Sequence, residues 1–393
     1  MKTVARGVLV VFTLAIATAI ATASTPSNGV SVDCSKGQSL NQALAKLDKH
    51  SSNTVTVGGT CTEYVQVIDF QGLTLKGTSG AAIVQPSTSA GNLFNAVLFI
   101  QGSQSVMVSG INVTADSTTP VAGIGIGHGS TDVRLRYLTV SGGGIVVFEN
   151  SQVSVAYVTS QSPGYSTLQI YDSSDVHVEH CQFTATPGSV WNVGIALGAA
   201  HVTMYATTIT DMQVGIGAYQ GSVVDIVNYD TYYSTGGNTD VNIQNPAGAN
   251  YNGVQVDAGG SLNVESARLV INKAGQTWGG TTGGVYLSDG ATMNASNGNL
   301  VIAGSNSQGV IAVNNAHATL NGASITSSGH GGVVAANMSS IDMAAGNSLS
   351  TIGGNAVDLF CDSTSWLTGT ANISGKPSSN CANQMTSETV ALP

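Results

Sequence analysis

Residues 123–147 read GIGIGHGSTDVRLRYLTVSGGGIVV, and this stretch decides the fold. Its apolar residues alternate with small or polar ones, as in Ile124 and Ile126, and short Gly/Ser turns separate the runs. Alternation with a period of two places these side chains on one face of a strand, which must be buried. A further apolar position, Val140, follows before the block starts again at Gly144. The unit is therefore three short strands and a return to the start.

The same block recurs along the chain at spacings of 21 to 38 residues. It starts at Gly123, Gly144, Thr167, Gly194, Gly215, Gly253, Gly284, Gly309, Gly332 and Asn355. Three strands per coil fit a solenoid of three sheets, in which each coil pairs in parallel with the next at roughly 4.8 Å. A propeller would need four strands in roughly forty residues per blade. We predict an all-β, single-stranded, right-handed parallel β-helix.

The ends of such a solenoid need caps, because apolar rungs and strand edges would otherwise be exposed. Leu40, Leu44 and Leu47 follow Ser39 at helical spacing, which predicts a capping helix over 39–49 with Ser39 as the N-cap. We place the N-terminal cap at 24–62, the β-helix at 63–360, and the C-terminal cap and tail at 361–393.

The first residues are typical of a secretory signal. Lys2 and Arg6 precede an apolar run over 8–20, and small residues lead to Ala23, which predicts a signal peptide over 1–23. The run is too short to span a bilayer, and no second run of about eighteen apolar residues follows. We expect a secreted protein, extracellular or periplasmic, that does not insert into a membrane.

The chain has 11 basic and 21 acidic residues, a formal charge of −10. Without Lys2 and Arg6 the charge is 9 − 21 = −12, which disfavours a nucleic-acid partner. Only 8% of residues are charged, and 49 residues are Gly. This composition is typical of proteins with many strands and turns. We expect a monomer.

Five cysteines in an exported chain favour pairing. We predict the disulfides Cys34–Cys61 and Cys361–Cys381, one near each end. The periodic position of Cys181 points inward, so we interpret it as a buried, inert thiol rather than a nucleophile.

The stretches TCTEY at 60–64 and LTLKG at 73–77, after the capping helix, resemble the start of pectin-lyase-like β-helix proteins. The resemblance implies a fold shared by pectate lyases, polygalacturonases, pectin esterases and alginate epimerases. Non-catalytic adhesins and phage tailspikes share it too, so the fold does not choose an activity.

Two enzyme patterns can be compared with the chain. Asn-Thr-Asp at 238–240 and Gly-His-Gly at 329–331 resemble parts of the polygalacturonase pattern, but its Asp pair and final Arg are missing. Inverting hydrolysis needs two carboxylates, so this match is insufficient.

Pectate lyases use an Arg on an exposed strand. Here Arg134 and Arg136 share an outward face with His177 and Glu179, an alternative cluster for acid–base chemistry. The competing interpretation is a solvated face with a loose ion pair.

Three long connections, 184–192, 227–252 and 272–283, are predicted to wall a groove on one side of the solenoid. Outward alternation places Phe148 and Asp257 in one column with two tyrosines. Aromatic faces beside amides and carboxylates suit sugar rings. The residues that we expect to bind substrate are Tyr171, Trp191, Tyr219, Tyr232, Tyr233 and Trp278.

Asp230, Asp240 and Asp257 are the predicted acid, base or calcium-binding carboxylates of that groove. No calcium-loop repeat is present, and the histidines are too scattered for a zinc cluster. We predict no metal or cofactor, and leave calcium open.

Two hypotheses follow. The first is a secreted β-helix that binds an extracellular polysaccharide over the rungs from Gly144 to Gly284, and in its stronger form cleaves it as a lyase or glycoside hydrolase. The second is a non-catalytic structural or adhesive surface solenoid. The sequence does not decide whether the protein is an enzyme.

Overall fold

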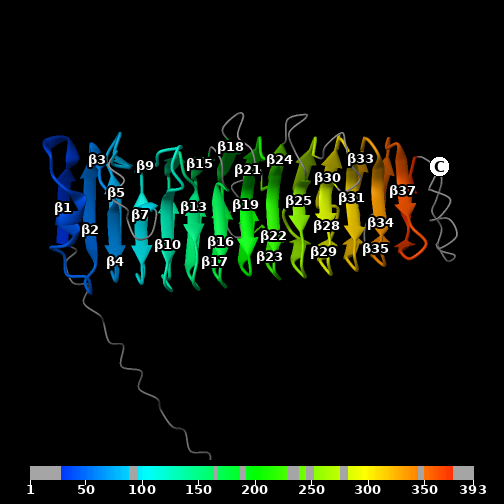
Figure 1. Cartoon of the computed structure of the whole chain (residues 1–393), viewed down its shortest axis with the longest axis horizontal. Helices are drawn as coiled ribbons and strands as arrows, with labels where there is room; N and C mark the ends of the chain where they lie inside the picture. Colours follow the sequence, from blue (N-terminus) through cyan, green and yellow to red (C-terminus); the bar gives the residue numbers. More distant parts are fainter. Residues whose placement is uncertain are drawn as a thin grey trace, which may run out of the picture.

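The computed structural model describes residues 28–87, 96–162, 166–185, 192–228, 239–244, 252–274, 282–343 and 349–374. These residues form a long solenoid in which three parallel sheets run side by side from the N-terminal to the C-terminal end (Figure 1). The predicted signal peptide over 1–23 lies outside the described residues.

The sheets are named by their strand counts, and every pairing between neighbouring strands is parallel. The 14-stranded sheet contains, in order, β1 (Asn28–Asp33), β2 (Asn53–Gly58), β5 (Leu73–Gly77), β8 (Met107–Ser109), β11 (Val133–Arg136), β14 (Gln152–Ala156), β17 (Asp175–Glu179), β20 (His201–Tyr205), β23 (Val223–Ile226), β26 (Ser261–Val264), β29 (Thr292–Ala295), β32 (His317–Leu320), β35 (Ser340–Met343) and β38 (Trp366–Gly369). The 13-stranded sheet contains β3 (Thr60–Thr62), β6 (Ala82–Val84), β9 (Asn112–Thr114), β12 (Thr139–Ser141), β15 (Thr159–Ser162), β18 (Gln182–Ala185), β21 (Thr208–Thr210), β24 (Val241–Gln244), β27 (Leu269–Asn272), β30 (Leu300–Ala303), β33 (Ser324–Thr326), β36 (Ser350–Gly353) and β39 (Ala371–Ile373). The 12-stranded sheet, at the front of Figure 1, contains β4 (Val65–Ile68), β7 (Ala96–Gln101), β10 (Ala122–Gly127), β13 (Ile145–Val147), β16 (Leu168–Tyr171), β19 (Val193–Gly198), β22 (Val214–Tyr219), β25 (Asn252–Val256), β28 (Gly283–Leu287), β31 (Gln308–Val313), β34 (Gly331–Ala336) and β37 (Val357–Cys361).

Each coil passes from the 12-stranded to the 14-stranded and then to the 13-stranded sheet, which confirms the predicted right-handed parallel β-helix. The register follows the sequence repeat, since Ile124 pairs with Ile145, and Ile145 pairs with Leu168. All three side chains are fully buried. Alternation along each strand therefore builds one continuous apolar core, as the period-two pattern predicts.

The column that contains Cys181 is also inside. Leu138, Val158, Thr207 and Ala267 share its burial, each at 2% exposure or less. Burial raises the pKa of the Cys181 thiol to about 12, which keeps it protonated and unreactive at neutral pH.

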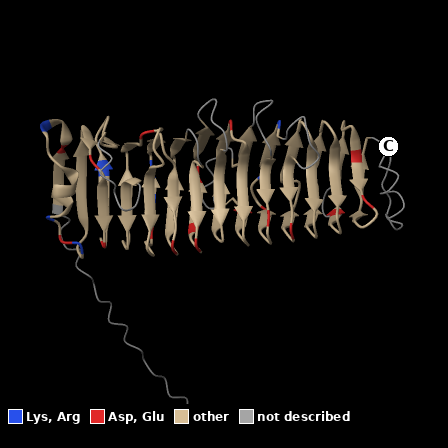
Figure 2. Cartoon of the chain, in the orientation of Figure 1, with Lys and Arg blue, Asp and Glu red and all other residues tan. Residues whose placement is uncertain are grey.

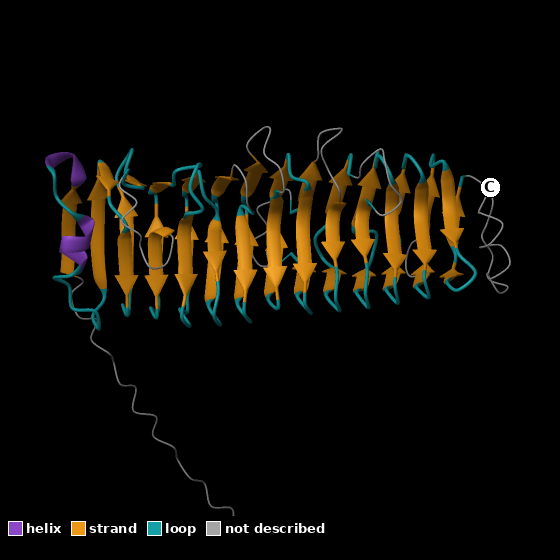
Figure 3. Ribbon diagram, in the orientation of Figure 1, coloured by secondary structure: helices purple, strands orange, loops and turns teal. Residues whose placement is uncertain are grey.

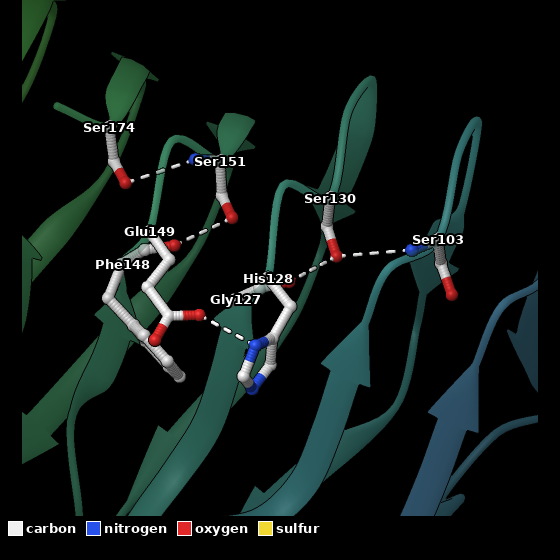
Figure 4. Close-up of polar contacts among 8 residues, drawn as sticks. All are labelled: Ser103, Gly127, His128, Ser130, Phe148, Glu149, Ser151 and Ser174. Carbon is white, nitrogen blue, oxygen red and sulfur yellow. Dashed lines mark hydrogen bonds and ion pairs between the residues drawn. The ribbon is translucent and has the colours of Figure 1, made fainter. Parts of the chain in front are cut away.

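A ladder of buried serines closes the corner between the 12-stranded and 14-stranded sheets (Figure 4). Ser130 Oγ accepts a hydrogen bond from the N–H of Ser103 at 3.3 Å and donates one to the carbonyl of Gly127 at 2.7 Å. The N–H of Ser151 likewise donates to Ser174 Oγ at 3.1 Å. The hydroxyls thus satisfy backbone groups that the turn would otherwise bury without partners.

The N-terminal end carries the predicted capping helix, shortened to α1 (Leu40–Leu44), after the 3-10 helix η1 (Cys34–Lys36) (Figure 3). Ser39 is the N-cap, as expected, but Glu63 supplies most of the capping. Its carboxylate accepts from the N–H of Leu40 at 2.6 Å and from Ser39 Oγ at 2.8 Å. A carboxylate at a helix N-terminus satisfies unpaired N–H groups and opposes their partial positive charge.

The predicted Cys34–Cys61 disulfide is present and ties this cap to the first coil. Disulfides are typical of oxidising compartments. The first strand of the 14-stranded sheet is β1, which precedes the capping helix in the sequence and pairs with β2. The same three sheets also contain strands that precede residue 63 and strands that follow residue 360, the bounds predicted for the β-helix.

At the C-terminal end the last coil is β37, β38 and β39. Cys361 is buried in this coil, and its predicted partner Cys381 lies outside the described residues. Ile352 is the inward apolar residue of β36, whereas Leu349 precedes the strand and is 37% exposed.

Candidate functional site

Three aromatic rings follow one another on the outer face of the 12-stranded sheet. Tyr171 pairs in register with Gly198, which pairs with Tyr219, and Phe148 follows Val147 in the same column. All three side chains are partly exposed. We call Phe148, Tyr171 and Tyr219 the aromatic column; the register confirms that they share a column, as alternation predicts.

Each ring of the aromatic column lies against a glycine. A methyl group at Gly127 would lie 2.5 to 2.9 Å from three ring atoms of Phe148. A methyl group at Gly198 would lie 2.9 Å from Cδ1 of Tyr171. Tyr219 leans back along its own strand, with its hydroxyl 2.5 Å from the methyl position of Gly217. Since only glycine leaves this room, the rings lie down on the sheet instead of standing out from it.

Burial, together with the nearby charge of Asp257 and the Tyr171 hydroxyl, raises the pKa of Tyr219 to about 12. Burial also raises the pKa of Tyr171. Both phenols are therefore neutral at physiological pH and can donate hydrogen bonds.

Asp257 continues the column past Tyr219. Its carboxylate accepts a hydrogen bond from Gln255 Nε2 at 2.6 Å and another from the hydroxyl of Ser288. Of the two predicted catalytic carboxylates that the structure describes, Asp257 is the one beside the aromatic column.

A pair of polar side chains lies at the other end of the column. His128 Nδ1 is 2.7 Å from Glu149 Oε2, and both residues occupy the corner position that follows the strand (Figure 4). The His128 ring packs against Phe148 and Phe99, at centroid distances of 5.9 and 6.3 Å. Sequence reasoning missed this pair, although both residues stand at the same offset in consecutive repeats.

The alternative cluster lies on the outer face of the 14-stranded sheet, and the structure assembles most of it. Glu179 Oε2 lies 3.5 Å from His177 Nε2 and accepts a hydrogen bond from the hydroxyl of Tyr205. The contact with His177, together with the Tyr205 hydroxyl and the charge of Arg136, lowers the pKa of Glu179 to about 2, against the opposing effect of burial. Arg134 does not join them, because its Nε pairs with Asp132 at 2.8 Å.

A second polar group continues the same face. His201 lies between two carboxylates, with Nδ1 2.9 Å from Asp175 Oδ1 and Nε2 2.9 Å from Asp225 Oδ2. These hydrogen bonds raise the pKa of His201 to about 9, against the opposing effect of burial. Asn263 donates to the other oxygen of Asp225 at 2.7 Å. The imidazolium is thus held by both ring nitrogens.

A stack of rings that the sequence did not suggest borders this face, at the corner with the 13-stranded sheet. Tyr137 and Tyr157 have centroids 5.0 Å apart, and Tyr157 and His180 4.7 Å apart, with nearly parallel planes. Their signal is a shared position one residue beyond the strand in consecutive coils. Each ring covers a face of its neighbour, and Tyr137 and Tyr157 remain 61% and 46% exposed.

Asp240 does not lie near Asp257. It precedes β24 at the corner between the 14-stranded and 13-stranded sheets, where its carboxylate binds Arg268 at 3.1 and 2.6 Å. Asp257 follows β25 at the opposite edge of the 14-stranded sheet. The carboxylates predicted for one groove are therefore separated by the width of a sheet.

The expected single loop over 227–252 is wrong, because it contains β24, whose Ile243 pairs with Ile209 in the 13-stranded sheet. Val241 and Ile243 are fully buried, so the insertion is divided between two corners. Five predicted site residues lie outside the described residues: Trp191, Asp230, Tyr232, Tyr233 and Trp278.

Within the described residues, the potential metal ligands that cluster are Cys34, Cys61 and Glu63. The two cysteines form the disulfide and Glu63 caps α1, so this group is already engaged. No helix in the described part of the chain is long and apolar enough to cross a membrane.

No protein-family model matches the chain, and no curated protein sequence matches it either. Among solved structures it is similar to tailspike protein 3 of bacteriophage CBA120, with a TM-score of 0.50, 10% identity and coverage of 87% of this chain. The alignment spans 55% of that tailspike.

The catalytic domain of a GH87 α-1,3-glucanase in complex with nigerose aligns with a TM-score of 0.46 and 11% identity, over 93% of this chain and 69% of that domain. The receptor-binding protein of bacteriophage Det7 aligns with a TM-score of 0.43 and 9% identity, over 88% of this chain and 74% of that one. At such low identity a likeness concerns the fold alone, and the chain is a right-handed parallel β-helix of the architecture found in the tailspike.

Proposed function

We propose that the protein is exported and binds an extracellular polysaccharide along the aromatic column. The observation that carries this proposal is the set of rings lying on glycines. A pyranose has apolar C–H faces and a rim of hydroxyls, so it packs best on a ring that lies along a surface.

The spacing of the column suits a chain of sugars. Successive coils are about 4.8 Å apart, so Phe148 and Tyr171 lie one coil apart and Tyr171 and Tyr219 two coils, roughly 10 Å, apart. A polysaccharide that runs parallel to the solenoid axis would meet successive rings one coil and then two coils apart. Asp257, Gln255 and the tyrosine hydroxyls then offer hydrogen bonds to its hydroxyl groups.

Export is part of the same proposal. It is supported by the signal-like sequence over 1–23 and by the Cys34–Cys61 disulfide, which needs an oxidising compartment to persist.

The test is a glycan array probed with the mature protein and with the double variant Tyr171→Ala/Tyr219→Ala. We expect the variant to bind at least about tenfold more weakly, since each aromatic contact contributes on the order of 1 kcal/mol. The matched control is Tyr137→Ala/Tyr157→Ala, which removes two tyrosines from the self-stacked group and should leave binding unchanged. Absence of binding to every glycan would contradict the proposal and favour the structural or adhesive alternative.

Cleavage is a second candidate function, favoured by the contact of Tyr205 and His177 with the Glu179 carboxylate. These groups could move a proton at a bound sugar chain on the 14-stranded face. Release of reducing ends or unsaturated products that is lost in Glu179→Gln would support it. If release persists in Glu179→Gln, the carboxylates to substitute next are Asp257, Asp230 and Asp240. Each variant is then assayed with and without added calcium.

A further inference from the structure

The strands beneath the aromatic column carry almost no charge. The twelve described strands of that sheet contain no Lys, Arg, His or Glu, and one Asp. That residue, Asp358, is 1% exposed and accepts a hydrogen bond from Asn355 Nδ2 at 2.8 Å. Charged residues gather instead on other strands and at the corners (Figure 2).

The 14-stranded sheet provides the contrast within the same molecule. Its strands carry the charged residues Asp33, Lys76, Arg134, Arg136, Asp175, Glu179, Asp225 and Asp342. The described strands of the 12-stranded and 13-stranded sheets thus carry almost no charge, and the charged strand residues lie mainly on the 14-stranded sheet.

The charges that border the aromatic column are mainly negative. Glu149, Asp172 and Asp257 follow the three strands β13, β16 and β25 at the corner with the 14-stranded sheet. The imidazole of His128 packs against the Phe148 ring, and its Nδ1 lies 2.7 Å from Glu149 Oε2. At the opposite corner the described basic side chains are Lys273 and His330, toward the C-terminal half.

Uncharged hydrogen-bonding groups take the place of charges beside the rings. Gln169 Oε1 accepts from the Tyr171 hydroxyl at 3.2 Å, and Gln255 stands in the equivalent column three coils on. Amides and phenols can exchange hydrogen bonds with sugar hydroxyls.

From this distribution we infer that the aromatic column takes a neutral polysaccharide, one without carboxylate, sulfate or phosphate groups. The inference rests on the proposed function and names its substrate class. An anionic chain would lose hydration at each charged group without meeting a cation, and it would meet the carboxylates of the corner. A neutral chain bears neither cost.

The test uses polymer pairs that differ only in charge: dextran with dextran sulfate, and hydroxyethyl cellulose with carboxymethyl cellulose, beside any neutral glycan found on the array. Binding is measured by affinity electrophoresis at low and at physiological salt. We expect the anionic member of a pair to bind at least about tenfold more weakly, with a smaller difference at higher salt because of screening.

A gain-of-function variant separates charge from shape. Gln169→Lys places a cation beside Tyr171 and should strengthen binding of the anionic member about fivefold or more at low salt. Gln152→Lys adds the same charge on β14 of the 14-stranded sheet and should not.

The outcomes are distinguishable. Binding of anionic polymers as tightly as neutral ones, with both lost in Tyr171→Ala/Tyr219→Ala, would overturn the inference and leave the proposed function standing. Failure of every polymer to bind would overturn both.

Discussion

The ring of Tyr171 rests on Gly198 of the adjacent strand, with Cδ1 2.9 Å from the position that a methyl group at Gly198 would take. Real Cβ contacts are essentially never so short, so the glycine and the ring orientation depend on each other. The ring surface that Tyr171 exposes therefore depends on both Tyr171 and Gly198.

Gly198→Ala should lift the Tyr171 ring from the sheet. We expect weaker glycan binding together with a loss of unfolding free energy of about 1–3 kcal/mol, the usual cost of overpacking. Denaturant unfolding and glycan titration measure the two effects. Gly29→Ala, where the new methyl group would have no neighbour within 4 Å, is the control for both. Unchanged binding in Gly198→Ala would show that the ring orientation is unimportant.

Glu63→Gln should destabilise the N-terminal cap. The carboxylate serves Ser39, Leu40 and Asn41, and an amide oxygen is a weaker acceptor that lacks the favourable charge. We expect a loss of about 1–3 kcal/mol in unfolding free energy. The exposed Glu265 provides the matched control, and Glu265→Gln should change stability by less than about 0.5 kcal/mol. An equal effect of the two variants would contradict the capping role.

His201 predicts a pH dependence of stability. Its folded pKa of about 9 lies above the unfolded value of about 6.5, so the folded state binds the proton more tightly. The stabilisation is complete below about pH 6.5 and is lost as the pH rises through about 9. Between these pH values, the melting temperature should fall less steeply with rising pH in His201→Gln than in the wild type. An NMR titration of His201 with a midpoint below neutrality would refute the assignment.

Cys181 should be inert in the folded protein. With its pKa raised to about 12 and 1% exposure, the thiol should not react with a thiol reagent at pH 8 until the chain unfolds. Mass spectrometry after alkylation in buffer and in denaturant would check this. Rapid labelling of Cys181 in buffer would show that this part of the core opens.

The sequence by itself determined the solenoid, because its cause is local. Residues such as Ile145 and Val147 alternate with a period of two, and the repeat stacks them into one core. The shared column of Tyr171 and Tyr219 follows from the same register. The helix cap at Ser39 follows from helical spacing, and the Cys34–Cys61 disulfide from the positions of the cysteines near the N-terminal end.

Only the tertiary structure decided how those side chains lie. Alternation tells that Tyr171 points outward, but its ring lies down because Gly198 of the next coil leaves room. The stack of Tyr137 on Tyr157 and the bond of Asp240 to Arg268 likewise join residues from different coils. Coil lengths vary, as the strand β24 inside 227–252 shows, so spacing in the chain does not give position in space. Period and polarity are properties of one strand, whereas a binding surface is made by the neighbours that other coils bring to it.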